Sequence, residues 1–351
     1  MGGVGVLVQA IVESPLAERW RIEVFNLSKP QQEGRPSTVT PWDVAWTLVH
    51  LVQLPWRILA RRPRVALVQS TADTGYVRDL ALIVICRLFR VPVVIHWHGT
   101  PDSTAFPGHG IARTLFDFGV ARAARFIVLA ESYRAYFAAV VPAAKLAVVP
   151  NFVDGRRWAQ GPAPAAAAAG PLRLLAVGRI GPAKGTDVLL DALALLSARG
   201  VATTASLVGE GESDAAFAAA RAHPMVVRGV ARLAGVLGEE RAGEYRSADV
   251  FLQPTRADSF PMAILEAMAA GLPVVASRVG AIPWMLGEGE CGVLVPPGDA
   301  AALADAIADL AASPARRAAL GDAGRARQQR DFDATGAAVA LDRILAEAAD
   351  R

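Results

Sequence analysis

Two cations in the second half of the chain are spaced so that they could hold a diphosphate. Arg179 and Lys184 lie five positions apart in a stretch that contains three glycines and follows an apolar, strand-like run. An arginine can bind two phosphate oxygens at once, and a lysine adds a compact second charge. The pattern favours a site that neutralises a leaving diphosphate. Two solvated loop charges are the alternative.

Two acids follow, Asp258 and Glu266, with seven residues between them. Asp258 or Ser259 is predicted to cap a helix whose first position lies near Pro261, and Gly271 is predicted to end that helix. Glu266 would lie in the second turn, where a carboxylate can accept two hydrogen bonds from a ribose diol. Asp258 would lie in the preceding loop and meet sugar hydroxyls. The alternative is a capping aspartate followed by an ordinary helical glutamate.

The start of this predicted helix is itself a candidate anion site. The amides of a first helical turn have no intrahelical acceptor, and the helix dipole is positive there. We expect the segment around Phe260, Pro261 and Met262 to face a diphosphate. Pro261 has no N–H, so Phe260 and Met262 would supply the donors.

His98 is the candidate in the first half of the chain. It ends an apolar run and precedes a glycine, and His96 lies two positions earlier on the same face of a strand. A hydrogen-bond donor at His98 could steady the transferred sugar or its developing positive charge. Either imidazole could instead be a core histidine, and that interpretation is favoured for His96. The histidines and carboxylates show no metal-ligand pattern, so we expect no metal.

Short β-branched runs alternate with helical stretches, which is typical of parallel sheets covered by helices. A Gly-Pro-Ala-Pro segment and an alanine run separate two sets of strands. We therefore expect an N-terminal α/β domain at 1–154, a linker at 155–170, a second α/β domain at 171–330, and a C-terminal helix at 331–351 that crosses back to the first. The predicted strands are 21–27, 65–69, 91–97, 125–129, 146–149, 172–177, 205–208, 225–228, 250–253, 273–276 and 292–295.

The amino terminus departs from an ordinary doubly wound domain, which opens with a strand that feeds a glycine turn. Gly2 and Gly3 lead directly into a predicted helix that ends near Glu13. Either this domain lacks its first strand, or the natural chain begins before Met1.

Together these segments resemble the retaining family-four glycosyltransferases of the GT-B fold (glycosyl transferases group 1). The resemblance covers nearly the whole chain. The segments that carry it are the Arg179/Lys184 loop, Asp258 to Glu266, 208–211, the junction-like 149–154 and the histidine motif 96–99. Two positions depart from the family pattern: Asp258 stands where glutamate is usual, and Pro261 stands where glycine is frequent.

The resemblance implies two Rossmann-like domains that face each other across a cleft. It also implies transfer of a sugar from a nucleotide-diphosphate sugar to an acceptor hydroxyl with retention, in polysaccharide or glycolipid assembly. No cofactor besides the donor, and no general base, is implied. The implied contacts are Arg179 and Lys184 to the diphosphate, Glu266 to the ribose, Asp258 and His98 to the transferred sugar, and Gly2, Gly3, Gly209, Gly211 and Arg228 to the rest of the donor.

The charge balance points to an anionic partner for the first half. Residues 1–165 contain 18 Lys+Arg and 11 Asp+Glu, whereas residues 166–351 contain 18 and 22. A membrane surface is favoured over nucleic acid, because no known nucleic-acid module is visible. Trp42, Trp46 and Trp56 precede several arginines, which suits a membrane interface and a lipid-linked acceptor. A helix buried against its sheet would explain the same residues.

The sequence also indicates a compartment and leaves two other functions open. No run is long and apolar enough to span a membrane, no secretory signal opens the chain, and Cys86 and Cys291 suit the reducing cytoplasm. We expect a cytoplasmic protein attached peripherally to the inner face of the membrane. A nucleotide-sugar 2-epimerase of the same fold, which needs no acceptor, and a catalytically silent sugar-nucleotide-binding protein are the alternatives.

Overall fold

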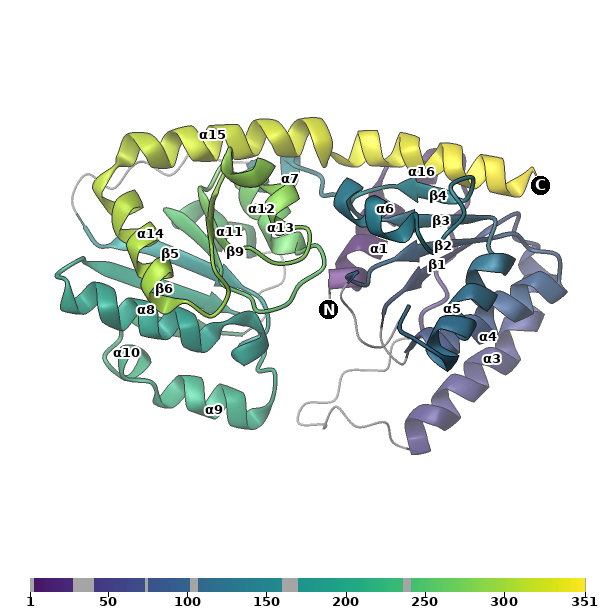
Figure 1. Ribbon diagram of the computed structural model, residues 1–351, viewed down its shortest axis with the longest axis horizontal. Coiled ribbons are helices and arrows are strands. Elements are labelled where there is room, and N and C mark those ends of the chain that lie inside the picture. The colour runs from purple at the N-terminus through teal and green to yellow at the C-terminus, as the bar shows by residue number, and fades with distance from the viewer. Residues whose placement is uncertain are drawn as a thin grey trace. The chain divides into compact units, whose positions relative to one another are not determined.

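The computed structural model describes residues 3–27, 41–72, 75–101, 107–159, 170–235 and 241–350. The chain forms two compact units, unit 1 with residues 1–151 and 337–351, and unit 2 with residues 152–336. Each unit contains one sheet, and every strand pair is parallel (Figure 1). The predicted α/β class with two parallel sheets is therefore confirmed. Within the described ranges, no helix has both the length and the apolar character needed to cross a bilayer.

Unit 1 contains a four-stranded sheet in the order β1-β2-β3-β4. Helices α3, α4 and α5 pack side by side (Figure 1). An ion pair of 2.7 Å between Arg125 and Glu347 ties α16 to β3. The elements are α1 (Gly3–Glu13), α2 (Leu16–Arg19), α3 (Pro41–Arg61), β1 (Ala66–Ser70), α4 (Gly75–Leu88), β2 (Val93–Trp97), α5 (Ile111–Arg122), β3 (Arg125–Val128), α6 (Glu131–Phe137), β4 (Leu146–Val148) and α16 (Ala334–Ala349).

Aromatic side chains fill the core on one face of this sheet. The Trp97 ring contacts those of Tyr76 and Phe116 edge to face, with centroids 5.3 and 5.4 Å apart, and all three side chains are fully buried. Phe126 and Phe137 complete the cluster. Because side chains alternate along a strand, the neighbours of Trp97 in β2 point to the opposite face.

The predicted strand at 21–27 is wrong, because this segment joins no ladder. Side chains hold it in place instead. The Trp20 indole donates to Asp342 at 2.8 Å, and Arg61 pairs with Glu23 at 3.2 Å. In the described part of the chain, no strand precedes β1.

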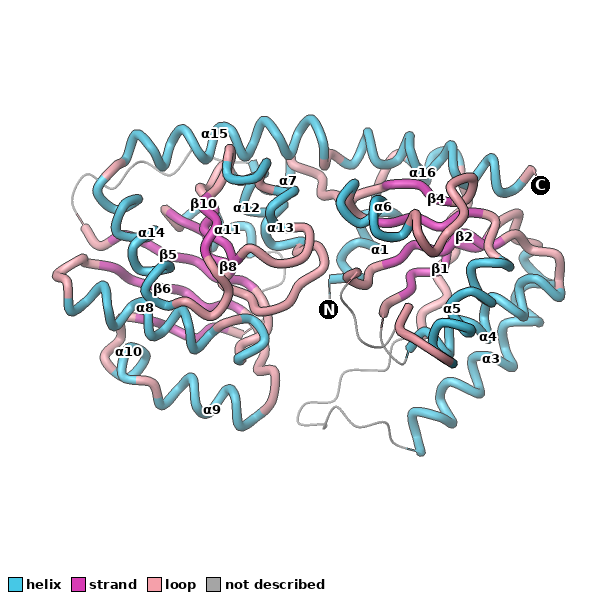
Figure 2. The backbone as a smooth tube through the Cα atoms, in the orientation of Figure 1, coloured by secondary structure: helices cyan, strands magenta, loops and turns pink. Residues whose placement is uncertain are grey.

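Unit 2 contains a six-stranded sheet in the order β10-β9-β8-β5-β6-β7 (Figure 2). In chain order this is 6-5-4-1-2-3, the doubly wound arrangement whose direction of winding reverses between β5 and β8. Helix α8 packs on α14, and α12 packs on α15. The elements are α7 (Arg156–Ala159), β5 (Leu172–Val177), η1 (Pro182–Lys184), α8 (Thr186–Ala198), β6 (Thr203–Val208), α9 (Asp214–Ala222), α10 (Pro224–Val227), β7 (Ala231–Ala234), α11 (Arg241–Ser247), β8 (Val250–Gln253), α12 (Met262–Ala270), β9 (Val274–Ser277), α13 (Ile282–Met285), η2 (Gly287–Gly289), β10 (Val293–Val295), α14 (Ala300–Ala312) and α15 (Pro314–Asp331).

The strand predicted at 225–228 is also wrong. These residues belong to α10 and the turn that follows it, and the strand begins later, at Ala231. Pro224 occupies the first helical turn, and the His223 ring accepts a hydrogen bond from the Met225 amide as a cap. These local signals favour a helix despite the β-branched residues.

The predicted linker at 155–170 begins with a packed helix. Trp158, in α7, is 5% exposed, and its ring lies edge to face against Tyr245 with centroids 5.2 Å apart. Residues 160–169 lie outside the described ranges. The start of the segment is therefore part of the core of unit 2.

Asp249 ties the start of β8 to β5. Its carboxylate is 8% exposed and accepts hydrogen bonds from the Arg173 amide at 2.8 Å and from the Arg173 guanidinium at 2.7 and 3.0 Å. Burial by itself would raise the pKa of Asp249, but the hydrogen bonds and the charge of Arg173 outweigh it, so the pKa lies below its ordinary value.

We predict that Asp249→Ala lowers the free energy of unfolding by about 1–2 kcal/mol at neutral pH, because charge-assisted hydrogen bonds are lost while the half-exposed Arg173 is partly screened by solvent. A depressed pKa stabilises the fold above the unfolded value, about 3.9, and the benefit is lost as the pH falls below it. Denaturant unfolding at neutral and acidic pH measures both effects. Asp305→Ala, which breaks an exposed pair with Arg199, is the control; equal losses in both variants would contradict the prediction.

Candidate functional site

The loops that follow β5 and β8 lie next to each other at the carboxyl edge of the unit 2 sheet. Doubly wound sheets bind ligands in the crevice at this reversal of strand order. A cavity of about 20 Å³ lies between the loops and is lined in part by Arg179, Lys184 and Gln253. Because this is room for about one water molecule, a larger ligand would have to lie over the loops.

The carbonyl oxygen of Ala183 joins the two loops. It accepts hydrogen bonds from Thr255 Oγ1 at 3.1 Å and from the Arg256 amide at 3.0 Å. Gly185 completes the contact, since its φ is +70° and a Cβ there would stand 1.9 Å from the Pro254 carbonyl oxygen. This position requires glycine. The backbones of the two loops are therefore in direct contact.

This contact brings Lys184 and Asp258 together although 74 positions separate them. The Lys184 ammonium pairs directly with an Asp258 carboxylate oxygen, and the two side chains are 23% and 13% exposed. Arg179, from the same loop as Lys184, is exposed and makes no ion pair with any described residue. The site thus has one neutralised cation and one that is available to an anion.

Gly209 and Gly211 lie beside the first loop. A Cβ at Gly209 would stand 1.8 Å from the Gly178 carbonyl oxygen, and one at Gly211 would stand 2.8 Å from the Cβ of Phe217. Ile180 forms an isolated bridge with Gly211. Both glycines permit close approach of protein atoms, and their contact with a donor stays a prediction.

Helix α12 begins at Met262, and Pro261 occupies its N-cap without a side-chain hydrogen bond. The prediction that Asp258 or Ser259 caps this helix is therefore wrong, because the Asp258 carboxylate faces Lys184 instead. Phe260 and Met262 are 3% and 6% exposed. The Ile264 amide donates to the Pro261 carbonyl at 3.2 Å, and no side chain caps the first turn. The positive end of the helix dipole favours an anion there.

Glu266 is 2% exposed, and both of its carboxylate oxygens already have partners. Arg241 donates to Oε1 at 2.8 Å, and the Tyr245 hydroxyl donates to Oε2 at 2.7 Å. Burial is the main cause of the raised pKa of Glu266, and Arg241 and Tyr245 act against that rise. The Arg241 guanidinium also lies 5.3 Å from the Trp158 ring centroid. Sequence reasoning missed Arg241, Tyr245 and Trp158, since no local pattern links them to Glu266.

Arg228 does not lie at this edge. It precedes the start of β7, and the Val230 carbonyl accepts from the amide of Ala205, early in β6. Arg228 is therefore at the amino edge of the sheet, opposite the edge where Arg179 and Lys184 lie, so the structure does not bring it together with them. The opposite end of β7 lies nearer the site, because the Ala234 carbonyl accepts from the Gly209 amide at 2.9 Å.

The remaining predicted residues belong to unit 1. Gly3 is the first residue of α1, and Gly2 lies outside the described residues. His98 directly follows β2 and is 7% exposed, with its Nε2 2.6 Å from Gln69 Oε1. Sequence reasoning missed Gln69. Over the described ranges, no three His, Cys, Asp or Glu side chains cluster as a metal site would require.

Two family models match this chain. Residues 1–157 match the model described as Glycosyltransferase Family 4, and residues 171–313 match the model described as Glycosyl transferases group 1. Together the matches cover most of both units.

Known proteins with related sequences or folds agree with these matches. The chain is 36% identical over 177 residues to a D-inositol 3-phosphate glycosyltransferase of Pseudarthrobacter chlorophenolicus, over 49% of this chain and 42% of that protein. It is 34% identical over 159 residues to a GDP-mannose-dependent alpha-(1-6)-phosphatidylinositol monomannoside mannosyltransferase of Mycolicibacterium smegmatis, over 43% and 42%. The matches thus span less than half of each relative. The crystal structure of Anabaena HepE in complex with UDP and glucose shares the fold, with a TM-score of 0.75, 18% identity, and coverage of 98% of this chain and 96% of that one.

We predict that Arg241→Leu lowers the free energy of unfolding by about 3 kcal/mol, because it leaves the buried Glu266 carboxylate without its cation. The pKa of Glu266 should rise further, so the loss should shrink at acidic pH, where the carboxyl is protonated in both states. Thermal unfolding at neutral and mildly acidic pH tests this. Arg232→Leu, which removes a half-exposed partner of Glu244, is the control. A pH-independent loss in Arg241→Leu would contradict the prediction.

Proposed function

Because the chain belongs to the family-four glycosyltransferases (glycosyl transferases group 1), we propose that it moves a sugar from a nucleotide-diphosphate sugar to an acceptor hydroxyl with retention of configuration. The observation that carries this proposal is the arrangement of Arg179, Lys184 and the uncapped start of α12 around one sheet reversal. Three cationic or donor groups at one edge suit a diphosphate.

Donor binding would exchange the partner of Lys184. In the free protein the ammonium is neutralised by Asp258. A diphosphate carries more charge than one carboxylate, and Arg179 is available to bind it at the same edge. Once released, the Asp258 carboxylate could accept hydrogen bonds from hydroxyls of the sugar. One ion pair would thus give way to a phosphate contact and a sugar contact.

The proposed reaction needs no protein side chain as a general base. The bond between the anomeric carbon and the phosphate oxygen breaks, and the acceptor oxygen attacks the same face of the sugar. The acceptor proton passes to the departing phosphate oxygen. Arg179 and Lys184 stabilise the negative charge that develops there, each contributing on the order of a few kcal/mol in a water-poor site.

A ribose contact by Glu266 requires a rearrangement. Because the side chain is 2% exposed and both oxygens are bonded, a ribose diol could reach it only by displacing the Arg241 or Tyr245 contact. We propose that Arg241 is the group that moves, because its side chain is 23% exposed whereas Tyr245 is fully buried.

We further propose a lipid-linked acceptor and attachment to the inner face of the membrane through unit 1. The mannosyltransferase relative of Mycolicibacterium smegmatis is named for a phosphatidylinositol monomannoside, which is a lipid. Six apolar side chains of α3, here called the α3 stripe, recur at helical spacing and are 52–71% exposed, whereas Leu54 and Ile58 of the same helix are buried. Such an exposed face fits a bilayer interface. The α3 stripe consists of Trp42, Leu48, Val49, Val52, Trp56 and Leu59.

Unit 1 has a second apolar surface, formed by α4 and α5. The groove between α4 and α5 has a volume of about 440 Å³ and an almost wholly apolar lining, with Val77 at its rim 54% exposed. Its one hydroxyl, from Thr114, donates to the carbonyl of Gly110 at 3.2 Å. We propose that this groove takes hydrocarbon from the same bilayer.

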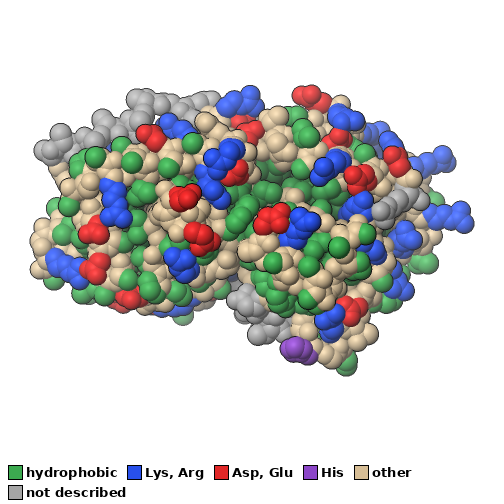
Figure 3. Space-filling model, turned by 45° about the horizontal axis from the view of Figure 1, so that its top comes forward, with side chains coloured by type: hydrophobic (Ala, Val, Ile, Leu, Met, Phe, Trp, Pro, Cys, Tyr) green, Lys and Arg blue, Asp and Glu red, His purple; other side chains and the backbone are tan. Residues whose placement is uncertain are grey.

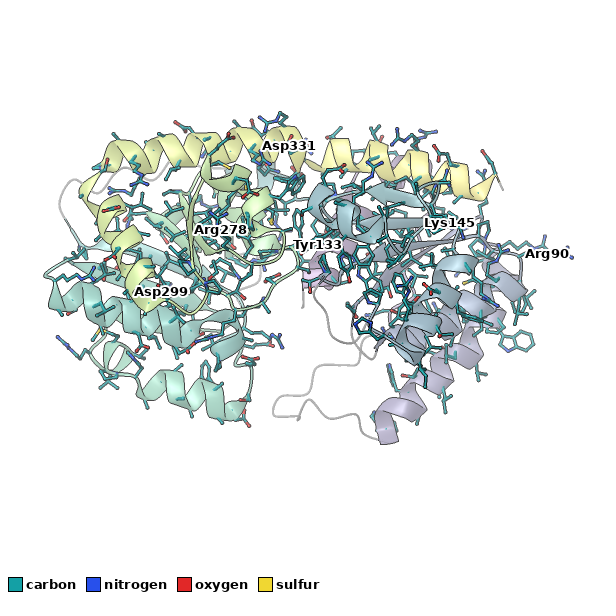
Figure 4. All side chains as sticks on the ribbon, in the orientation of Figure 1. Arg90, Tyr133, Lys145, Arg278, Asp299 and Asp331 are labelled. Atoms are coloured by element: carbon teal, nitrogen blue, oxygen red, sulfur yellow. The ribbon has the colours of Figure 1, made fainter. Side chains whose placement is uncertain are left out.

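The basic side chains near these surfaces should contribute less to membrane binding than the sequence suggests, because several of them are paired with acids. Arg61 pairs with Glu23 and Arg64 pairs with Asp350. Arg90, which extends away from the ribbon (Figure 4), makes no ion pair with a described residue. On the face shown in Figure 3, acidic and basic side chains are interspersed. Apolar insertion should therefore contribute more than charge to membrane binding.

We predict that Lys184→Ala weakens binding of UDP or GDP by about 10- to 100-fold, since a charge-assisted contact is lost. Asp258→Asn should leave nucleotide binding equal or tighter, because Lys184 loses its competing partner, and should lower turnover. Calorimetry with UDP and GDP measures nucleotide binding. Product formation from UDP-glucose or GDP-mannose measures turnover. Arg199→Ala, on the exposed end of α8, is the control.

Three outcomes of these assays would contradict the proposed function. Unchanged binding in Lys184→Ala would place the diphosphate elsewhere. A new sugar nucleotide formed from the donor alone would identify an epimerase. Binding without turnover across donors and acceptors would identify a silent binding protein.

We predict that Val52→Asp and Val77→Asp each weaken binding to phosphatidylglycerol vesicles about tenfold, since burying a valine side chain is worth about 1.5 kcal/mol. Val339→Asp on α16 is the matched control, because Val52 and Val339 are both 68% exposed. Cosedimentation with vesicles measures binding, and unfolding temperatures check that all three variants fold. Equal binding by Val52→Asp and Val339→Asp would show that the α3 stripe does not enter the membrane.

A further inference from the structure

Among the described residues, Gln69 is the side chain that forms a hydrogen bond with the His98 ring. Strand β1 places Gln69 in register with His96 of β2, and His98 lies two positions beyond His96 on the same face of the sheet. The Gln69 Oε1 and His98 Nε2 atoms are 2.6 Å apart. The His98 ring also lies against the His96 ring, with centroids 4.5 Å apart.

Contacts of the backbone hold His98 in place independently of its side chain. Its amide donates to the Ser70 carbonyl at 2.7 Å, which extends the pairing of β1 with β2 by one residue. A Cβ at Gly99 would stand 2.2 Å from the Cβ of Ala72, so only glycine allows this approach. Rotation of the ring is the freedom that remains, and the hydrogen bond to Gln69 restricts it.

His98 is neutral at physiological pH. It is 7% exposed, and burial, followed by repulsion from His96, holds its pKa well below the ordinary histidine value. A neutral imidazole has one N–H and one lone pair. An amide oxygen is only an acceptor, so the N–H must be on Nε2, and Nδ1 must carry the lone pair.

We propose that Gln69 is a positioning residue that holds His98 in the Nε2–H tautomer and so presents Nδ1 as a hydrogen-bond acceptor to a sugar hydroxyl. This inference rests on the proposed function. Nδ1 has no hydrogen-bond partner among the described residues. The polarity is opposite to the donor expected from the sequence.

The acceptor polarity restricts the group that His98 can meet. A hydroxyl can donate its proton to Nδ1, whereas an ionised carboxylate or phosphate oxygen would place a second lone pair against it. His98 therefore selects a neutral sugar at this position and disfavours a uronic acid whose carboxylate would fall there. His98 therefore accepts a hydrogen bond from a sugar hydroxyl and does not help to bind the diphosphate.

The tautomer can be measured on the full chain without any ligand. Long-range ¹H–¹⁵N correlation spectra of ¹⁵N-histidine-labelled protein separate a protonated Nε2 from a protonated Nδ1, and His98→Gln assigns the signals. We expect the Nε2–H form. The Nδ1–H form would show that the Gln69 amide donates instead, and would overturn the proposal.

Ligand titration of the same sample tests the hydroxyl contact. UDP-glucose or GDP-mannose should shift the Nδ1 signal, and UDP or GDP alone should leave it unchanged. A binding sugar nucleotide that leaves Nδ1 unchanged would overturn the contact. If calorimetry detects no binding by any of the four, the proposed function fails, while the tautomer result stands on its own.

Variants of Gln69 separate positioning from general stability. Gln69→Leu should weaken sugar-nucleotide binding about three- to tenfold relative to the bare nucleotide, the effect of one hydrogen bond. Gln69→Glu keeps an acceptor oxygen in the same place, but its negative charge favours a protonated His98. At alkaline pH, where His98 is neutral, it should restore both the tautomer and the selectivity. Gln329→Leu, an exposed position on α15, is the control. Equal impairment in Gln69→Leu and Gln69→Glu would argue against a positioning role.

Discussion

The loops after β5 and β8 can hold Lys184 against Asp258 because their backbones touch. The Ala183 carbonyl accepts hydrogen bonds from both Thr255 and Arg256. The two loops approach so closely at Gly185 that a side chain at this position would clash with the Pro254 carbonyl. In a parallel sheet whose order reverses between two neighbouring strands, the following loops diverge to opposite faces. This backbone contact keeps their ends together, and the geometry of the whole candidate site depends on it.

Both acids that define the site are satisfied inside the protein. Asp258 is paired with Lys184, and Glu266 with Arg241 and Tyr245. Isolated carboxylates in a water-poor edge would be costly, and the protein supplies both with partners. In the proposed reaction, donor binding is therefore an exchange of hydrogen bonds. Its net free energy is the difference between two sets of contacts and does not equal the sum of those made to the donor.

Side chains alternate between the two faces of the sheet along β2, so the strand contributes to the core of unit 1 on one face and positions the candidate residue His98 on the other. Trp97 enters the aromatic core on one face, while His96 and the following His98 face the other side with Gln69. The same strand thus anchors the unit and orients an imidazole. Because the aromatic core is fully buried, the strand offers a rigid support for the ring.

The sequence by itself determined the α/β class, most of the strands, the glycine that ends α12 at Gly271, and the cations and acids proposed for the candidate site. These depend on local patterns: β-branched runs, glycine turns and charge spacing. The segments 21–27 and 225–228 were misjudged because side-chain anchors and a proline with a histidine cap outweighed strand propensity. Tertiary structure alone decided which charges pair. Lys184 meets Asp258, Arg241 meets Glu266, and Gln69 meets His98 across separations of 25 to 74 positions, and no local pattern encodes such contacts. It also put Arg228 at the amino edge of its sheet, opposite the edge where Arg179 and Lys184 lie, because the edge on which a residue lies depends on where its strand begins.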